Sequence, residues 1–304
     1  MGQNARGAPF LKFNRARQIR TDMNRWTSLA LCVAQFAAVS AAAQSLPTPN
    51  MDIPEASSYR GFDWGFSTGF DYVTNARCNI VSRSISCIST DTSAFSVPST
   101  VMAQFDRVRL QVTVPFVDLE GPGQLSGALG TKQIVGSPTG PISRRYGLGD
   151  VSVGAAVILL RTGEILPRVE LGGIIKAPTG KDGLGTGKTD YGAQISLYRP
   201  LWPGTSLFGS GGYQWVGDPN TVDLHKGARA TAGFDTNYGI IGGGALLDYN
   251  QSLLAGLPNS FTVDPYVTLR VFGSVGLQVY TAIALTQQSP SRQYGFRIVF
   301  GHRE

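Results

Sequence analysis

The sequence predicts an all-β fold: a transmembrane antiparallel β-barrel of about twelve strands, with short periplasmic turns and longer external loops. Three observations predict it. Apolar and polar residues alternate with a period of two in one segment after another. The connections between these segments are alternately short and long, and the chain begins with the features of an export signal.

The export signal lies near the start of the chain. Met23 to Trp26 forms a short basic start, Thr27 to Ser40 is an apolar run, and Ala41-Ala42-Ala43 is a small-residue cleavage site. The apolar run is too short to cross a bilayer as a helix, which needs about 20 residues. We therefore predict that residues 1–43 are a signal peptide. The residues before Met23 are either a basic extension or the result of a start assigned too early, and the complete signal from Met23 favours the second.

Most of the excess basic charge belongs to this leader. Of the 26 Lys and Arg residues, six lie in the first 43 positions against the single acid Asp22: Arg6, Lys12, Arg15, Arg17, Arg20 and Arg25. The rest of the chain carries 20 basic and 19 acidic side chains and is nearly neutral. Nucleic-acid-binding proteins gather Lys and Arg on the mature surface, so we expect no nucleic-acid partner.

Two cysteines follow the leader, Cys78 and Cys87, with eight residues between them. In an exported protein this pair is predicted to form a disulfide that closes a small loop, and two free buried thiols are the alternative. The leader's own Cys32 follows the large residue Leu31, which disfavours a lipoprotein signal. After the leader no stretch reaches 18 apolar residues, so we expect no transmembrane helix.

Alternation defines the predicted strands. In one segment Trp64, Phe66 and Phe70 share one parity while polar and small residues hold the other, which places the two sets on opposite faces of a strand. The same test predicts twelve strands, of which the second is the weakest because Pro98 interrupts it: 60–74, 94–105, 107–117, 147–160, 165–177, 188–199, 205–216, 226–236, 239–250, 262–272, 274–286 and 291–300.

The connections support a membrane barrel. Short joins alternate with long ones, as periplasmic turns alternate with external loops in outer-membrane barrels. An even strand count returns both ends of the chain to the periplasm. We therefore divide the chain into the leader, a periplasmic segment at 44–57 and a barrel at 58–304.

Charged residues near the middle of the strands decide which face points inward. A soluble barrel is apolar inside, whereas a membrane barrel is polar inside and apolar towards lipid. Aromatic residues of the apolar face gather near the strand ends, as in an interfacial girdle, with Tyr72, Trp215, Tyr249 and Tyr294 expected at the external end and Trp64, Phe234 and Phe300 at the periplasmic end. The candidate pore-lining residues are Arg107, Arg109, Arg168, Glu170, Lys176, Asp190, Tyr198, Phe208, Arg229, Asp248, Tyr266, Arg270, Tyr280 and Arg297.

Glycine-rich motifs carry a resemblance to a known family. Gly147-Leu148-Gly149-Asp150, Val114-Pro115-Phe116, and the stretch from Ile175 through Pro178-Thr179-Gly180 to Gly187-Lys188-Thr189-Asp190 resemble elements of an outer-membrane transporter family associated with phenol-degradation pathways, the MetA-pathway type. The resemblance covers most of residues 58–300. It implies a barrel in the outer membrane of a Gram-negative bacterium that admits small hydrophobic or aromatic compounds. It implies no catalytic residues. One departure is the tail Gly301 to Glu304, which follows the terminal aromatic Phe300 that assembly machinery would recognise.

No catalytic or metal site is predicted. Gly187-Lys188-Thr189 lacks the glycine that a phosphate-binding loop needs at position 182, where Asp stands. The chain has two histidines, His225 and His302, and no serine is identifiable as a nucleophile for either. We therefore expect no enzyme, no cofactor and no metal.

The expected function is passive uptake of small hydrophobic or aromatic solutes through an outer-membrane channel. Expected partners are these solutes, outer-membrane lipid and the barrel-assembly machinery. The alternatives are a non-conducting barrel with a binding or structural role and, less favoured, a lipid-modifying barrel enzyme. The interior charges suggest a mild preference for anions, or else a network that only stiffens the wall. Loop 118–146, rich in Gly and Pro and containing Arg144-Arg145, is the candidate plug or constriction, and an ordinary external loop is an equally compatible alternative.

Overall fold

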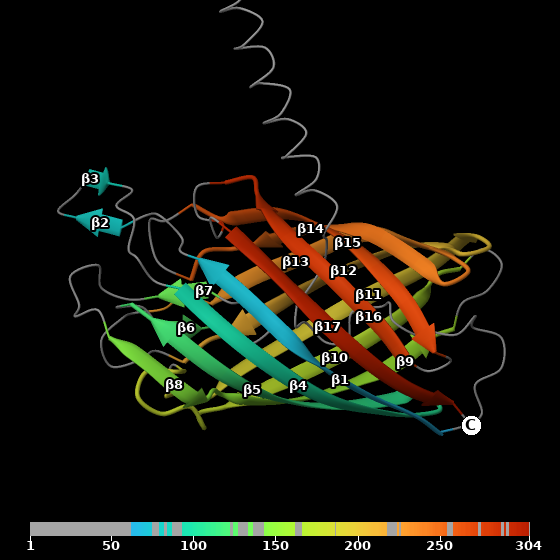
Figure 1. Ribbon diagram of the computed structural model, residues 1–304, viewed down its shortest axis with the longest axis horizontal. Helices are drawn as coiled ribbons and strands as arrows, with labels where there is room; N and C mark the ends of the chain where they lie inside the picture. Colours follow the sequence, from blue (N-terminus) through green and yellow to red (C-terminus); the bar gives the residue numbers. More distant parts are fainter. Residues whose placement is uncertain are drawn as a thin grey trace, which may run out of the picture. The chain divides into compact units, whose positions relative to one another are not determined.

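The computed structural model is a closed antiparallel β-barrel, and neighbouring strands run side by side at a tilt (Figure 1). The structure describes residues 62–74, 79–81, 84–86, 93–121, 124–126, 133–135, 143–161, 166–185, 187–217, 224, 226–253, 258–272, 275–286, 289 and 292–303. The leader, the segment 44–57, Cys78, Cys87 and His225 lie outside these residues, so the signal peptide, the disulfide and the role of the segment stay predictions. Among the described residues, no helix is long and apolar enough to cross a membrane.

Twelve strand positions close the wall, which confirms the predicted fold class. Each strand pairs with its neighbour in the chain, and pairing of the first with the last closes the cylinder. The strands are β1 (Phe62–Thr74), β4 (Ser93–Phe105), β5 (Val108–Glu120), β8 (Arg144–Leu148) with β9 (Val151–Leu160), β10 (Arg168–Ala177), β11 (Asp190–Trp202), β12 (Thr205–Trp215), β13 (Gly227–Tyr238), β14 (Ile241–Asn250), β15 (Ser260–Phe272), β16 (Val275–Ala284) and β17 (Arg292–Arg303).

Two small hairpins lie in the long connections. One is β2 (Asn79–Val81) with β3 (Ser84–Ser86), and the other is β6 (Gln124–Ser126) with β7 (Gln133–Val135). At the opposite end of the barrel the turns are short. Residues Asp106, Gly204 and Gly239 adopt positive φ angles of 49°, 77° and 63° in three of them, which lets the chain reverse within two residues. The alternation of short and long joins agrees with the sequence prediction.

Pro98, which weakened the prediction of the second strand, lies within β4. It stands directly opposite Pro115 of β5, so two residues that cannot donate a backbone hydrogen bond share one rung of the ladder. In β5 the alternation of buried and exposed residues continues on both sides of this rung, whereas in β4 it is regular before Pro98 and weak after it.

The predicted strand 147–160 is wrong in one respect. Strand pairing already begins at Arg144, and the strand is interrupted at Gly149 and Asp150, so that β8 and β9 share one wall position against β5. Gly149 N still donates to Pro115 O at 2.9 Å. The interruption turns the Asp150 carboxylate towards the strand end of β10, where it becomes part of the site described below.

The two faces of the wall confirm the inverted polarity of a membrane barrel. The interior positions are rich in buried Arg, Lys, Asp, Glu, Gln and Thr, while the outward positions expose Val, Leu, Ile and aromatic side chains. Outward aromatic residues pair near both ends of the wall. Tyr72 packs on Tyr294 with ring centroids 5.1 Å apart at the long-loop end, and Phe62 packs on Phe105 at 4.8 Å at the short-turn end. This surface suits a lipid environment with aromatic girdles.

Candidate functional site in the barrel interior

The structure places twelve of the fourteen predicted pore-lining residues on the interior face of the wall. The two others are Arg107 and Arg270, which are exposed at the short-turn end: Arg107 lies in the turn between β4 and β5, and Arg270 lies next to a shift in register in β15. The interior residues are Arg109, Arg168, Glu170, Lys176, Asp190, Tyr198, Phe208, Arg229, Asp248, Tyr266, Tyr280 and Arg297. They form four groups along the barrel, and whether they line a conducting path stays a prediction.

The first group is an ion cluster near the short-turn end. Glu170 accepts from Arg109 and lies 2.7 Å from Arg168, and the side chains of all three are less than a tenth exposed. The Arg168 guanidinium lies over the ring of Tyr198, 5.4 Å from its centroid. The Tyr198 hydroxyl is 2.6 Å from the hydroxyl of Ser206. One carboxylate thus holds two arginines from neighbouring parts of the wall.

The second group is aromatic. Phe208, Leu246, Tyr266 and Tyr280 form a buried apolar cluster inside the barrel, and Tyr198 packs against it. A Cβ added to Gly295 would lie 2.4 Å from the Tyr280 ring, and one added to Gly244 would lie 2.8 Å from the Tyr266 ring. Glycine at these positions therefore lets each ring lie close against the neighbouring strand. The result is a buried aromatic cluster on the inner side of the wall.

Two hydrogen-bond donors border the aromatic cluster. The Tyr280 hydroxyl and one terminal nitrogen of Arg297 are buried and have no hydrogen-bond partner among the residues that the structure describes, and Tyr280 is only 1% exposed. The Arg297 guanidinium lies over the Tyr280 ring at 5.9 Å from the centroid, and its charge is balanced by Asp71 at 4.0 Å. A donor that makes no described hydrogen bond beside an aromatic ring, as the Tyr280 hydroxyl does here, can bind a solute that offers an acceptor oxygen.

The third group joins β13, β14 and β15. Arg229 donates to Asp248 at 3.0 Å, and the Thr231 hydroxyl donates to the same carboxylate oxygen. Asp264 lies in the next strand, one interior position along from Thr262, which pairs directly with Asp248. The carboxylates of Asp248 and Asp264 therefore share a neighbourhood with one arginine.

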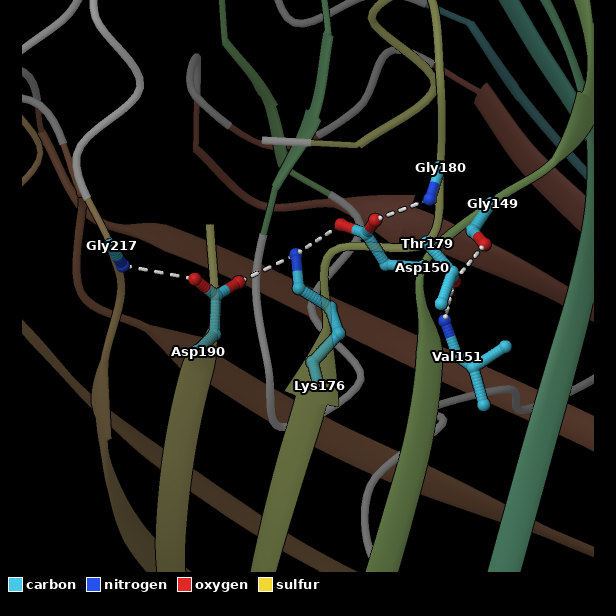
Figure 2. A network of polar contacts seen from close by, with 8 residues as sticks. All are labelled: Gly149, Asp150, Val151, Lys176, Thr179, Gly180, Asp190 and Gly217. Carbon is cyan, nitrogen blue, oxygen red and sulfur yellow. Dashed lines mark hydrogen bonds and ion pairs between the residues drawn. The ribbon is translucent and has the colours of Figure 1, made fainter. Parts of the chain in front are cut away.

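The fourth group ties the long-loop end together (Figure 2). The Lys176 ammonium lies between two carboxylates, 3.0 Å from Asp150 and 2.5 Å from Asp190. Asp190 also accepts from Gly217 N, and Asp150 accepts from Gly180 N, both at 2.9 Å. Figure 2 shows Lys176 between Asp150 and Asp190, with Asp190 in contact with Gly217, so the contacts join the break before β9 to β10, β11 and the segment after β12.

The Thr179 side chain contacts the backbone on both sides of the interruption between β8 and β9. Its hydroxyl accepts from Val151 N at 2.8 Å and donates to Gly149 O at 2.9 Å, as drawn in Figure 2. Backbone groups that an unbroken strand would pair with β10 or β5 are thus satisfied by a side chain. The motifs Gly149-Asp150 and Pro178-Thr179-Gly180, far apart in the sequence, meet here and hold the break in place.

Several functional candidates were missed by the sequence prediction: Asp150, Asp235, Asp264, Thr179 and Leu184. Asp264 could have been found from the sequence, because it lies two residues from Thr262 and two from Tyr266 and therefore on the same interior face of the strand. Asp150 and Thr179 carried none that spacing alone could reveal, because their partners lie about 30 residues away in the chain.

The described interior carries more acidic than basic side chains. Among the described interior residues, seven buried carboxylates face four buried basic groups and the partly buried Arg145 and Arg297: Asp71, Asp150, Glu170, Asp190, Asp235, Asp248 and Asp264 against Arg109, Arg168, Lys176 and Arg229. Arg107 and Arg270, which tilted the sequence estimate towards basic charge, lie outside this set. The balance runs against the anion preference expected from the sequence.

Comparison with known proteins places the chain in a family. A crystal structure of an outer membrane channel from Pseudomonas putida F1 matches with a TM-score of 0.59 and 15% identity, covering 83% of this chain and all of that one. The KdgM porin (TM-score 0.46, 10% identity, 79% of this chain and 99% of that chain) and the toluene transporter TbuX of Ralstonia pickettii (0.40, 12%, 81% and 90%) are also similar. The first match shows the same fold.

Among curated proteins no sequence matches the chain. A family model described as "Putative MetA-pathway of phenol degradation" matches residues 91–300. This match agrees with the resemblance carried by the glycine-rich motifs and spans more than half of the chain. The chain therefore belongs to this family.

Proposed function

We propose that the chain is a bacterial outer-membrane channel for the passive uptake of small aromatic or hydrophobic solutes. The observation that carries the proposal is an aromatic cluster beside donors that make no described hydrogen bond, on the inner wall of a closed barrel whose outer wall is apolar. A barrel of about eight strands is filled by its own side chains, whereas one of 16 or more encloses a wide aqueous channel, so twelve strands suit a narrow path.

The aromatic cluster supports the class of solute. Rings of Tyr198, Phe208, Tyr266 and Tyr280 offer apolar faces, and the Tyr280 hydroxyl and Arg297 offer donors to an oxygen on the solute. The family description, which refers to phenol degradation, and the similar P. putida protein, described as an outer membrane channel, are consistent with such a solute. Outer-membrane lipid, the barrel-assembly machinery and the signal peptide at 1–43 belong to the same proposal.

A non-conducting barrel is the second candidate, and the ion clusters favour it. The cluster of Arg109, Arg168 and Glu170 at one end joins β5 to β10 across β9, and Asp150, Lys176 and Asp190 join strands at the other end, as they would in a barrel with a purely structural or binding role. The two candidates differ in whether the barrel conducts.

Conductance in planar bilayers distinguishes them. The purified, folded protein is expected to give discrete conductance steps, and a salt gradient is expected to give a reversal potential with the sign of a modest preference for cations, because interior carboxylates outnumber basic groups. Steps that favour anions would contradict the charge argument. Silence at all voltages and salt concentrations, from protein shown to be folded, would support the non-conducting barrel.

A further inference from the structure

Loop 178–189, which joins β10 to β11, is held at both of its ends. Lys176 precedes the loop and Asp190 follows it, and their side chains lie 2.5 Å apart (Figure 2). Asp150 contacts both Lys176 and Gly180 N, so Asp150, Lys176 and Asp190 together form a clamp on the loop. A Cβ added to Gly185 would lie 2.2 Å from the Asp150 carboxylate, so the middle of the loop also packs on this group.

The tip of the loop folds towards the interior. Leu184 is 4% exposed and packs in a socket formed by Ala94, Val117 and Leu119. In β4 and β5 these three residues have the same parity as the buried polar residues of the interior, while Phe95 and Phe116 next to them are exposed outward. Leu184 therefore reaches past β8 and β9 and contacts the inner side of the wall, not the lipid side.

A second set of contacts holds the tip. One terminal nitrogen of Arg145 donates to Asp182 O at 3.3 Å and the other donates to Gly121 O at 2.9 Å, so a single side chain joins the loop to the end of β5. Asp182 and Gly183 have φ angles of 54° and 77°, which turn the chain back towards the socket. Gly217 lies against the other side, because a Cβ there would be 2.5 Å from Lys188 Cβ.

We infer that the described residues of the β10–β11 loop, 178–185 and 187–189, narrow the external mouth of the barrel and that Leu184, seated in its socket, sets the upper size of solutes that enter. Inward-folded loops are a common way to form a channel constriction. The inference rests on the proposed channel function. The sequence suggested loop 118–146 for such a role, and that prediction stays open because residues 122–123, 127–132 and 136–142 lie outside the described part of the chain.

The test compares Leu184→Asp with Lys181→Asp in the full-length protein after export. A carboxylate at position 184 cannot remain unpaired in an apolar socket, so the tip is expected to leave it. Lys181 is exposed in the same loop and adds a carboxylate without entering the socket. Single-channel conductance and swelling of proteoliposomes in sugars of increasing size are measured for both variants and the wild type.

Leu184→Asp is expected to raise conductance about twofold or more and to admit larger sugars, because a wider mouth lowers the resistance of the narrowest section. Lys181→Asp is expected to match the wild type. Leu184→Ser, which also empties the apolar socket but adds no charge, serves if Leu184→Asp fails to fold. The neutral triple variant Asp150→Asn, Lys176→Met and Asp190→Asn releases the clamp and is expected to change conductance in the same direction.

The outcomes separate this inference from the proposed function. If the wild type conducts and folded Leu184→Asp and Leu184→Ser show its conductance and size limit, the inference is wrong and the channel proposal stands. If the wild type is silent and Leu184→Asp conducts, the loop closes the mouth and the inference holds. If every variant is silent, the channel proposal fails, and the inference fails with it.

Discussion

Replacing Glu170 with alanine is expected to lower the free energy of unfolding of the barrel by about 3–5 kcal/mol, the usual cost of removing one partner from a buried ion pair. Glu170 is the carboxylate that both Arg109 and Arg168 contact in the ion cluster near the short turns. Without it, two guanidinium groups would lie in the interior without this shared partner, and their like charges would repel. The cost arises mainly from these stranded charges, because the carboxylate itself contributes little net energy once its desolvation is included.

Urea unfolding of the protein from lipid vesicles measures this loss. Glu120→Ala is the matched control. Glu120 is an exposed carboxylate at the long-loop end of β5, whereas Arg109 lies at the short-turn end of the same strand, and removal of the Glu120 carboxylate is expected to change the free energy of unfolding by less than about 0.5 kcal/mol. Replacing the whole cluster by Arg109→Met, Arg168→Met and Glu170→Leu is expected to recover most of the loss. A loss below about 1 kcal/mol for Glu170→Ala would mean that the arginines find other partners or water.

Introducing arginine on the outer wall at Val267 is expected to cost about 2–4 kcal/mol, the penalty for a basic side chain at the midplane of a transmembrane barrel. Val267 is the eighth of the thirteen residues of β15, and 42% of its surface is exposed on the outward face. In a soluble barrel a position as exposed as this one would accept arginine with little change in the free energy of unfolding. In lipid the guanidinium must be buried in hydrocarbon or must pull the surrounding bilayer inward.

Ile240→Arg supplies the control for Val267→Arg. Ile240 is 64% exposed in the turn between β13 and β14, at the short-turn end of the wall. Near the interface the same substitution is expected to cost about 0–1 kcal/mol. Equal and small costs at both positions, measured by unfolding from vesicles, would contradict a lipid-facing outer wall.

Alternation was enough to predict the barrel because each strand has lipid on one side and the polar interior on the other. That difference in solvent imposes a period of two on the sequence itself, so strands such as β5 and β15 are legible from local residues. Pro98 weakened one prediction because a lone proline argues against a strand, whereas its pairing with Pro115 depends on register, which local sequence does not specify.

The candidate site was only partly predictable. Residues such as Arg168 and Asp248 were found because parity alone places them inside. The clamp of Lys176 with Asp150 and Asp190 was missed as a unit, because it depends on a break in the wall and on the folding of a loop back over it. Contacts between a loop and strands that are distant in the chain produce no periodic pattern in the sequence. The inward position of Leu184 could therefore be found only from the structure.

Solute uptake into vesicles with an outer leaflet of lipopolysaccharide tests the central proposal most directly. The protein is expected to speed the entry of an aromatic solute with an oxygen substituent well above that of a sugar alcohol of similar size. Tyr280→Ala is expected to reduce this preference, because it removes a ring of the aromatic cluster and one unpaired donor. Entry of the aromatic solute no faster than into vesicles without protein, with the barrel shown to be folded, would contradict the proposal.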